Sequence, residues 1–164
     1  MAEKIKNVID KPFQRQDSKS NAHVGRIFEE SVQEYFHSQG LMLDKKIKVN
    51  VGFSLKKKEH EFDLGSLVSK VIVECKSHRW TRNKKKEIQN VPSAKLTVWN
   101  EAMYYFVCAP KEYRKILVVA YDYWPKRDLT LAQYYIKTYY HLIPDDVELW
   151  ELNEDENSAI KLLN

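Results

Sequence analysis

The sequence predicts an α/β domain in which helices flank a mixed central β-sheet. Five segments carry the alternating or continuous apolar patterns of strands, and three segments carry the apolar spacing of helices. These segments follow one another in the order α-β-β-β-α-β-α-β, which indicates a mixed sheet covered by helices. The 164 residues are enough for one domain with a sizeable core.

The first half of the predicted domain is a helix followed by three strands. Residues 22–39 repeat apolar side chains at helical spacing, and Gly40 stands where helices usually end. Residues 46–53 alternate polar and apolar side chains, with Phe53 on the apolar face, and residues 60–64 form a second strand. Residues 70–76 are apolar on both faces, which is typical of a central strand.

The second half alternates helices with buried strands. A helix follows Pro92, where apolar residues stand 3, 4 and 3 positions apart. Residues 116–120 form a continuous apolar run and predict a buried strand. Asp128 or Thr130 can cap a third helix rich in tyrosine, and residues 147–152 alternate again as a last strand. We therefore divide the chain into a flexible polar arm (1–20), a folded domain (21–153) and a frayed acidic tail (154–164).

The composition excludes several classes of protein. Hydrophobic residues make up 43% of the chain and charged residues 30%, as in soluble globular proteins. Two cysteines cannot form a disulfide scaffold or a four-thiolate zinc site. No apolar run approaches the ~20 residues of a membrane span, and the first residues carry no apolar signal region. We expect a cytoplasmic protein that does not bind membranes.

Paired acids and a lysine stand on two neighbouring predicted strands. Asp63 lies on one strand, and Glu74 and Lys76 end the next, two residues apart and therefore on one face. Carboxylates provide the hard oxygen ligands that Mg²⁺ prefers, and a nearby lysine can orient and help deprotonate a water. Glu74 also follows a Val-Ile-Val run, where a core strand favours an apolar residue. The plain alternative is a surface Glu–Lys pair at a strand end.

Residues 23–123 resemble the PD-(D/E)XK nuclease superfamily, whose fold is called restriction-endonuclease-like. The resemblance rests on the order of the elements, on Asp63 in one strand and on Glu74-x-Lys76 in the next. The segment Gly25-Arg26-Ile27-Phe28-Glu29 is similar to the Gly-x-x-Phe-Glu pattern of the superfamily's first helix.

The resemblance implies a restriction-endonuclease-like core, DNA as substrate and Mg²⁺ as cofactor, with Mn²⁺ as a substitute. Phe62 stands where the superfamily often has proline, at a position that varies widely. The implied metal ligands are Asp63, Glu74, the Cys75 backbone carbonyl and Glu29, and the implied catalytic residues are Asp63, Glu74, Lys76 and Glu29.

Helical phase distinguishes two adjacent acids of the first helix. Glu29, Val32 and Phe36 are spaced 3 and 4 apart, which places Glu29 at the edge of the apolar stripe. Glu30 falls on the polar face, so we expect Glu30 in solvent and Glu29 facing inward. A boundary acid paired with a nearby lysine is the other interpretation of Glu29. His60 is expected to lie at a strand end without a ligand role.

Positive charge gathers in the middle of the chain. Residues 45–86 hold 13 Lys or Arg against 4 Asp or Glu, a local charge of +9. Such a segment suits a polyanion, because each cation beside a phosphate releases counterions, although lysines also serve as solvated strand edges. The basic residues that follow the third strand are predicted to hold the DNA backbone: Arg79, Arg82, Lys84, Lys85 and Lys86.

These patterns and the resemblance together predict a Mg²⁺-dependent endonuclease that hydrolyses DNA phosphodiester bonds, whether restriction-like, resolvase-like or a repair enzyme. Cutting both strands requires two active sites, so we expect a homodimer. Two other classes stay open. One is a catalytically inactive nucleic-acid-binding module of the same fold, and the other is a protein-interaction domain that uses the aromatic C-terminal third.

Overall fold

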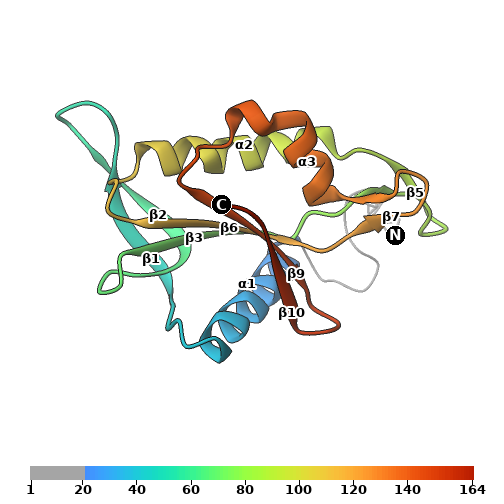
Figure 1. The fold of residues 1–164 in the computed structure, drawn as a ribbon, viewed down its shortest axis with the longest axis horizontal. Coiled ribbons are helices and arrows are strands. Elements are labelled where there is room, and N and C mark those ends of the chain that lie inside the picture. Colours follow the sequence, from blue (N-terminus) through green and yellow to red (C-terminus); the bar gives the residue numbers. More distant parts are fainter. Residues whose placement is uncertain (1–20) are drawn as a thin grey trace, which may run out of the picture.

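The structure is a computed structural model that describes residues 21–164. Within these residues, three α-helices and a six-stranded mixed sheet form an α/β fold with two small hairpins (Figure 1). The sheet order is β1-β2-β3-β6-β9-β10. This confirms the predicted class, an α/β protein with helices around a mixed sheet. The predicted flexible arm, residues 1–20, lies outside the described residues.

The first half of the fold is one helix and an antiparallel meander. The elements are α1 (Asn21–Ser38), β1 (Asp44–Val51), β2 (Lys58–Ser66) and β3 (Val71–Lys76). Gly40 adopts a φ of +83° directly after α1, a conformation that glycine reaches without strain and that ends many helices. All four elements therefore lie where the sequence predicts them, within a few residues at each end.

The second half adds parallel strands through helical crossovers. Its main elements are α2 (Ser93–Cys108), β6 (Arg114–Ala120), α3 (Leu131–Tyr139), the 3-10 helix η1 (Tyr140–Leu142) and β9 (Val147–Asn153). β6 pairs in parallel with both β3 and β9. The Thr130 hydroxyl accepts a hydrogen bond from the Gln133 N–H, and the Gln133 side chain accepts one from the Thr130 N–H, so Thr130 is the cap of α3.

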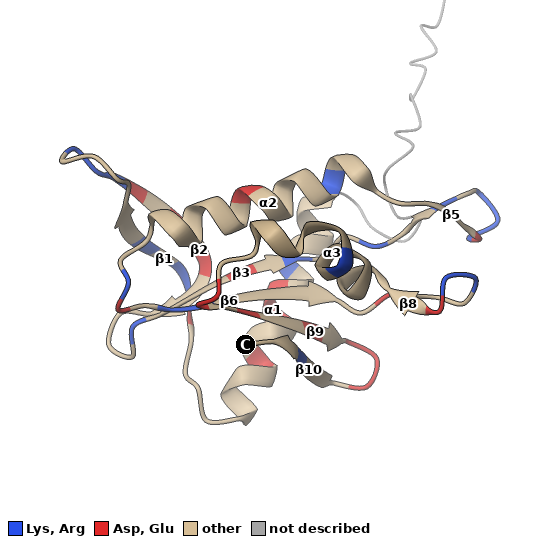
Figure 2. Ribbon diagram, turned by 45° about the horizontal axis from the view of Figure 1, so that its top comes forward, with Lys and Arg blue, Asp and Glu red and all other residues tan. Residues whose placement is uncertain are grey.

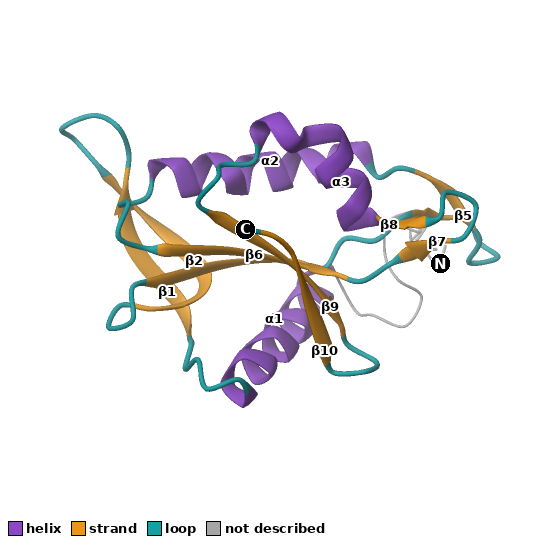
Figure 3. Cartoon of the chain, viewed as in Figure 1, coloured by secondary structure: helices purple, strands orange, loops and turns teal. Residues whose placement is uncertain are grey.

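Two short hairpins lie outside the main sheet. One joins β4 (Thr81–Arg82) to β5 (Ile88–Asn90), and the other joins β7 (Tyr123–Trp124) to β8 (Leu129–Thr130). The first contains four of the five basic residues that are predicted to hold the DNA backbone. Both hairpins lie near the same end of the molecule (Figure 3).

Helices cover both faces of the sheet, so β3 is buried on both sides. α1 packs on one face, where Phe28 and Val32 join Val73 in the core. α2 and α3 cover the opposite face, where Trp99 and Tyr135 join the main core cluster (Figure 3). Polar side chains at the end of β3 are therefore held in a region with little water. None of the described helices is long and apolar enough to cross a membrane.

Two predictions about element ends are wrong. The predicted frayed tail contains β10 (Ser158–Leu163), which pairs antiparallel with β9 and completes the sheet. The acids of this region, residues 154–156, are confined to the β9–β10 turn, so they do not prevent pairing. Phe53 was expected on the buried face of a strand, but β1 ends at Val51 and Gly52 turns the chain with a φ of +135°, which leaves Phe53 69% exposed.

Candidate functional site

The site forms where β2 parts from β3. The two strands pair only from Leu64 to Ser66 on β2, and Gly65 makes this approach possible. A Cβ on Gly65 would lie 2.4 Å from the Val71 carbonyl oxygen, so no larger residue fits without movement. Beyond this contact, Asp63 Oδ2 accepts a hydrogen bond from the Cys75 N–H at 2.7 Å. A side chain thus takes the place of strand pairing and brings a carboxylate between the strands.

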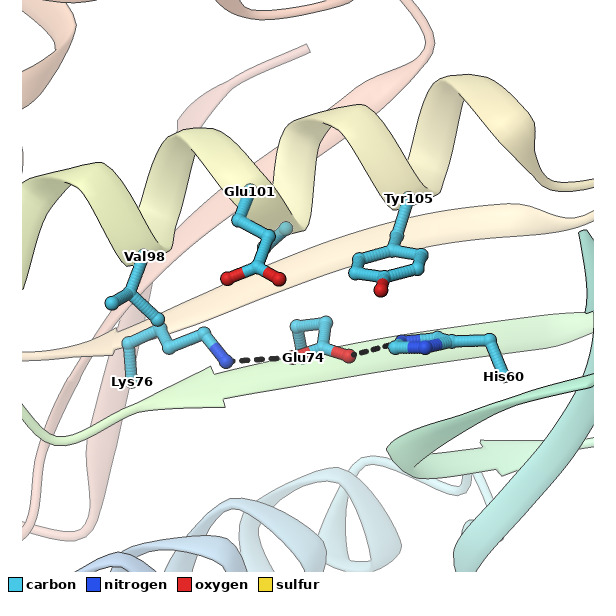
Figure 4. A pocket seen from close by; sticks show the side chains of 7 residues that line it. His60, Glu74, Lys76, Val98, Glu101 and Tyr105 are labelled. Carbon is cyan, nitrogen blue, oxygen red and sulfur yellow. Dashed lines mark hydrogen bonds and ion pairs between the residues drawn. The ribbon is translucent and has the colours of Figure 1, made fainter. Parts of the chain in front are cut away.

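Glu74 is buried on β3 and has a partner at each oxygen. Oε2 accepts from Lys76 Nζ at 2.7 Å, and Oε1 lies 3.4 Å from His60 Nε2 (Figure 4). Burial raises the pKa of Glu74, but the hydrogen bond with His60 and the positive charge of Lys76 outweigh it and lower the pKa overall. Glu74 is therefore an ionised carboxylate at neutral pH.

Lys76 is held in its charged form. Burial lowers the pKa of its ammonium group, but the negative fields of Glu74 and Asp63 more than offset this and raise the pKa above its ordinary value. The side chain is only 15% exposed. In this arrangement Lys76 supplies positive charge and hydrogen bonds. A lysine that helps to deprotonate a water would need an uncharged amine, which Lys76 does not offer here.

Asp63 has the most perturbed carboxyl group of the site. Burial first, and then the charge of Glu74, raise its pKa to about 7, although Lys76 and the Cys75 N–H act in the opposite direction. At neutral pH, Asp63 therefore divides between its acid and carboxylate forms. Two carboxyl groups share one lysine, and the local positive charge does not fully compensate them.

The two acids of α1 face different surroundings. Burial raises the pKa of Glu29, and this carboxyl group feels the charges of Lys45, Lys76 and Glu74. Glu30 instead makes an ion pair with Lys45 at 3.0 Å, with a side chain that is 46% exposed. This is the phase that the helical spacing predicts, with Glu29 turned towards the site and Glu30 in solvent.

A small pocket lies between β3 and α2, with a volume of about 140 Å³. Glu101 and Tyr105 point from α2 towards Glu74, and the Tyr105 ring stacks on His60 with 3.7 Å between the ring centres (Figure 4). Sequence reasoning did not place His60, Glu101 or Tyr105 at the site. The one local signal was the spacing of Glu101 and Tyr105, four apart on one helix face, and that spacing does not say which way the face points.

Two of the predicted DNA-binding residues make internal ion pairs. Arg82 binds both carboxylate oxygens of the buried Asp122, at 2.6 and 2.7 Å. Arg79 binds Glu154 at 3.0 Å and the Tyr121 carbonyl at 2.7 Å. The other three residues, Lys84, Lys85 and Lys86, are exposed in the β4–β5 hairpin. That hairpin lies at one end of the molecule, and the β1–β2 loop lies at the other (Figure 2).

The donor types suit a hard cation, but the described side chains do not form a ligand cluster. Within residues 21–164, no group of three or more His, Cys, Asp or Glu side chains is arranged to hold a metal ion. Glu74 turns its oxygens to Lys76 and His60, and Asp63 turns one to the Cys75 N–H. Asp63 and Glu74 supply the carboxylate oxygens that Mg²⁺ prefers, at a place short of positive charge.

No protein-family model, curated protein or solved structure matches this chain. The functional argument therefore starts from the geometry of the site. Its main features are the carboxyl groups of Asp63 and Glu74, which differ in pKa, and the charged Lys76, which also lines the α2 pocket. A third acid, Glu29, faces these groups from α1.

Proposed function

We propose that the protein is a metal-dependent nuclease that hydrolyses DNA phosphodiester bonds, built on a restriction-endonuclease-like core. The observation that carries this proposal is the meeting of Asp63, Glu74 and Lys76 at the point where β2 parts from β3. Glu29 faces the same point from α1. The order α1-β1-β2-β3-α2-β6 supports the same fold.

Mg²⁺, or Mn²⁺ in its place, would be held by Asp63, Glu74 and the Cys75 carbonyl, with Glu29 as a further acid. The raised pKa of Asp63 supports this assignment, because it reflects crowded negative charge that a divalent cation would relieve. A bound cation would supply positive charge for a phosphate and make a water more acidic. Lys76 would donate hydrogen bonds from its ammonium group to a phosphate oxygen, and Glu29 would accept one from a water.

Cleavage of a supercoiled plasmid with Mg²⁺ or with EDTA tests the proposal. Asp63→Asn keeps an oxygen for the Cys75 N–H, so it removes charge while the fold is retained. We expect Asp63→Asn and Glu74→Gln each to lower the rate at least about a hundredfold. Glu112→Gln, an exposed acid in the turn before β6, is the matched control and should cleave normally.

Cleavage assays with other DNA substrates identify the type of nuclease. A preference for four-way junctions over linear duplexes would indicate a resolvase, and discrete fragments from linear DNA would indicate a restriction-like enzyme. Paired cuts in both strands require two sites, and sedimentation should then give a homodimer. Full cleavage by both acid variants, or no cleavage with Mg²⁺ or Mn²⁺, would contradict the proposal.

A catalytically inactive DNA-binding module is the second candidate. It is favoured by one observation, namely that both Glu74 oxygens already have partners in Lys76 and His60. Thermal unfolding with increasing Mg²⁺ separates the two candidates. If the protein is a nuclease, Mg²⁺ binding should raise the melting temperature of the wild type but not that of Asp63→Asn. If it is an inactive module, it should bind DNA, and Mg²⁺ should affect the melting temperatures of both proteins equally.

A further inference from the structure

The β1–β2 loop presents apolar and basic side chains together in solvent. Residues 52–58, which we call the loop segment, read Gly-Phe-Ser-Leu-Lys-Lys-Lys and contain no acid. Phe53 is 69% exposed and Leu55 is fully exposed. Lys56, Lys57 and Lys58 are exposed as well. The loop projects beyond the rest of the fold (Figure 1).

Contacts at its base hold the loop segment in place. The Gly52 N–H donates to the Cys108 carbonyl at the end of α2 at 3.0 Å. The Phe53 ring packs edge-on against Tyr104, with 6.1 Å between the ring centres. Lys48 and Glu59 form an ion pair at 3.2 Å across the two strands of the stem. The base is thus fixed, and Leu55 has no role in the core.

The loop segment adjoins the candidate site along α2. Tyr104 contacts Phe53, and the next residue, Tyr105, lines the pocket beside Glu74. Cys108 lies three residues after Tyr105, which is about 5 Å along the axis of a helix. A polymer whose backbone reaches Glu74 and Lys76 along α2 therefore passes close to the loop segment.

We propose that the loop segment docks on duplex DNA beside the bond that is cleaved. The three lysines contact phosphates, and Leu55, supported by Phe53, enters a groove and wedges between base pairs. Lysines release counterions at phosphates, and apolar wedges partly unstack base steps. The inference rests on the proposed nuclease function, and it adds a surface that positions the substrate next to the site.

The shape and charge favour DNA over other partners. Two apolar side chains offer far less than the ~800 Å² per partner of a stable protein interface. An anionic membrane shares the chemistry of phosphate and an apolar layer, but it is not the substrate of the proposed nuclease, whose bond to be cleaved belongs to a nucleic acid at Glu74 and Lys76. Charge complementarity and the adjoining pocket therefore point to DNA.

Binding without cleavage tests the loop segment directly. In EDTA, a short random-sequence duplex containing 2-aminopurine reports both affinity and local unstacking. We expect Leu55→Ser to weaken binding about tenfold and to remove the rise in 2-aminopurine fluorescence. Changing Lys56, Lys57 and Lys58 to glutamine should reduce the slope of log affinity against log salt by about 0.9 for each lost contact.

Two matched controls give the result its meaning. Val68→Ser removes another exposed apolar side chain, 95% exposed in the β2–β3 turn, and should leave binding unchanged. Changing Lys84, Lys85 and Lys86 to glutamine removes the same charge from the β4–β5 hairpin. This variant should bind duplex more weakly, but at saturating duplex it should keep the 2-aminopurine signal. Unfolding curves of each variant should match the wild type, because every changed residue is exposed.

The outcomes separate this inference from the proposed function. If the wild type cleaves plasmid but the loop variants bind duplex as the wild type does, the loop segment has another role and the nuclease stands. If Leu55→Ser instead loses binding to phosphatidylcholine–phosphatidylserine vesicles and keeps its affinity for DNA, the inference is overturned in favour of a membrane. If the wild type neither binds nor cleaves DNA, both proposals fail together.

Discussion

Two groups of buried charge differ in how completely they are compensated. Asp122, just after β6, receives two hydrogen bonds from the Arg82 guanidinium and one from the Trp80 N–H. Asp63 and Glu74, by contrast, repel one another and share the single ammonium of Lys76. We call Asp122, Arg82 and Trp80 the paired cluster, and we call Asp63, Glu74 and Lys76 the underpaired cluster.

The comparison shows how surroundings assign a role to a carboxylate. The paired cluster has donors on both carboxylate oxygens of Asp122, so the charge holds β4 and the residue before it to the end of β6. The underpaired cluster keeps Asp63 at a pKa of about 7, a cost in stability that a purely structural acid has no reason to bear. Such strongly shifted groups gather at functional sites.

Breaking the paired cluster should give the largest change in stability. Asp122→Ala leaves the buried Trp80 N–H without its acceptor and removes the carboxylate partner of the Arg82 guanidinium. We expect the free energy of unfolding to fall by about 3 kcal/mol. Urea unfolding followed by circular dichroism measures this loss. A loss below about 1 kcal/mol would mean that water replaces the carboxylate and that the cluster is not structural.

Removing charge from the underpaired cluster should act in the opposite direction. Asp63→Asn keeps the acceptor for the Cys75 N–H and removes the repulsion from Glu74. At pH 8 we expect the variant to be more stable than the wild type by roughly 1–3 kcal/mol. Equal or lower stability at pH 8 would show that Asp63 is compensated after all.

The pH dependence of that difference sharpens the comparison. The folded-state pKa of Asp63, about 7, is above its ordinary value of 3.8, so folding favours the protonated form. Its contribution to wild-type stability is fully present below about pH 4, falls as the pH rises, and is lost through pH 7. Unfolding measurements from pH 4 to pH 8 should therefore show the advantage of Asp63→Asn growing and then levelling off.

The smallest expected changes in stability are those of Glu29 and Glu30, which differ instead in their effect on cleavage. Glu29→Gln should reduce plasmid cleavage substantially with little change in stability, because Glu29 faces the underpaired cluster. Glu30→Gln removes only an exposed ion pair with Lys45, so cleavage should stay near normal and stability within about 0.5 kcal/mol. If Glu30→Gln is the inactive variant, α1 contributes the other acid.

Local patterns predicted most elements, because strand alternation and helical spacing reflect burial on one face. They failed at β10, where three acids before the strand suggested a solvated tail although these acids occupy only the turn. They also did not reveal the ion pairs of Arg79 and Arg82, whose partners Glu154 and Asp122 lie 75 and 40 residues away. No local spacing reveals a partner at that distance.

The candidate site was predictable in part for the same reason. Asp63, Glu74 and Lys76 lie on adjacent strands, so alternation and chain order suffice to bring them together. His60 and Tyr105 meet only because β2 leaves β3 beyond Leu64 and α2 packs over the opening. That arrangement depends on tertiary packing, and the local sequence around His60 does not predict it.

The local pairing of β1, β2 and β3 also gives the site a place in the order of folding. These strands join neighbours along the chain, whereas β3 meets β6 only through a crossover that contains α2. Short loops close at a lower entropy cost, so we expect the meander to form first, while Asp63 and Glu74 are still hydrated. Docking of α2 then removes water from both acids. Alkaline solution, which keeps both acids ionised, should therefore slow this late step and leave the early one unchanged.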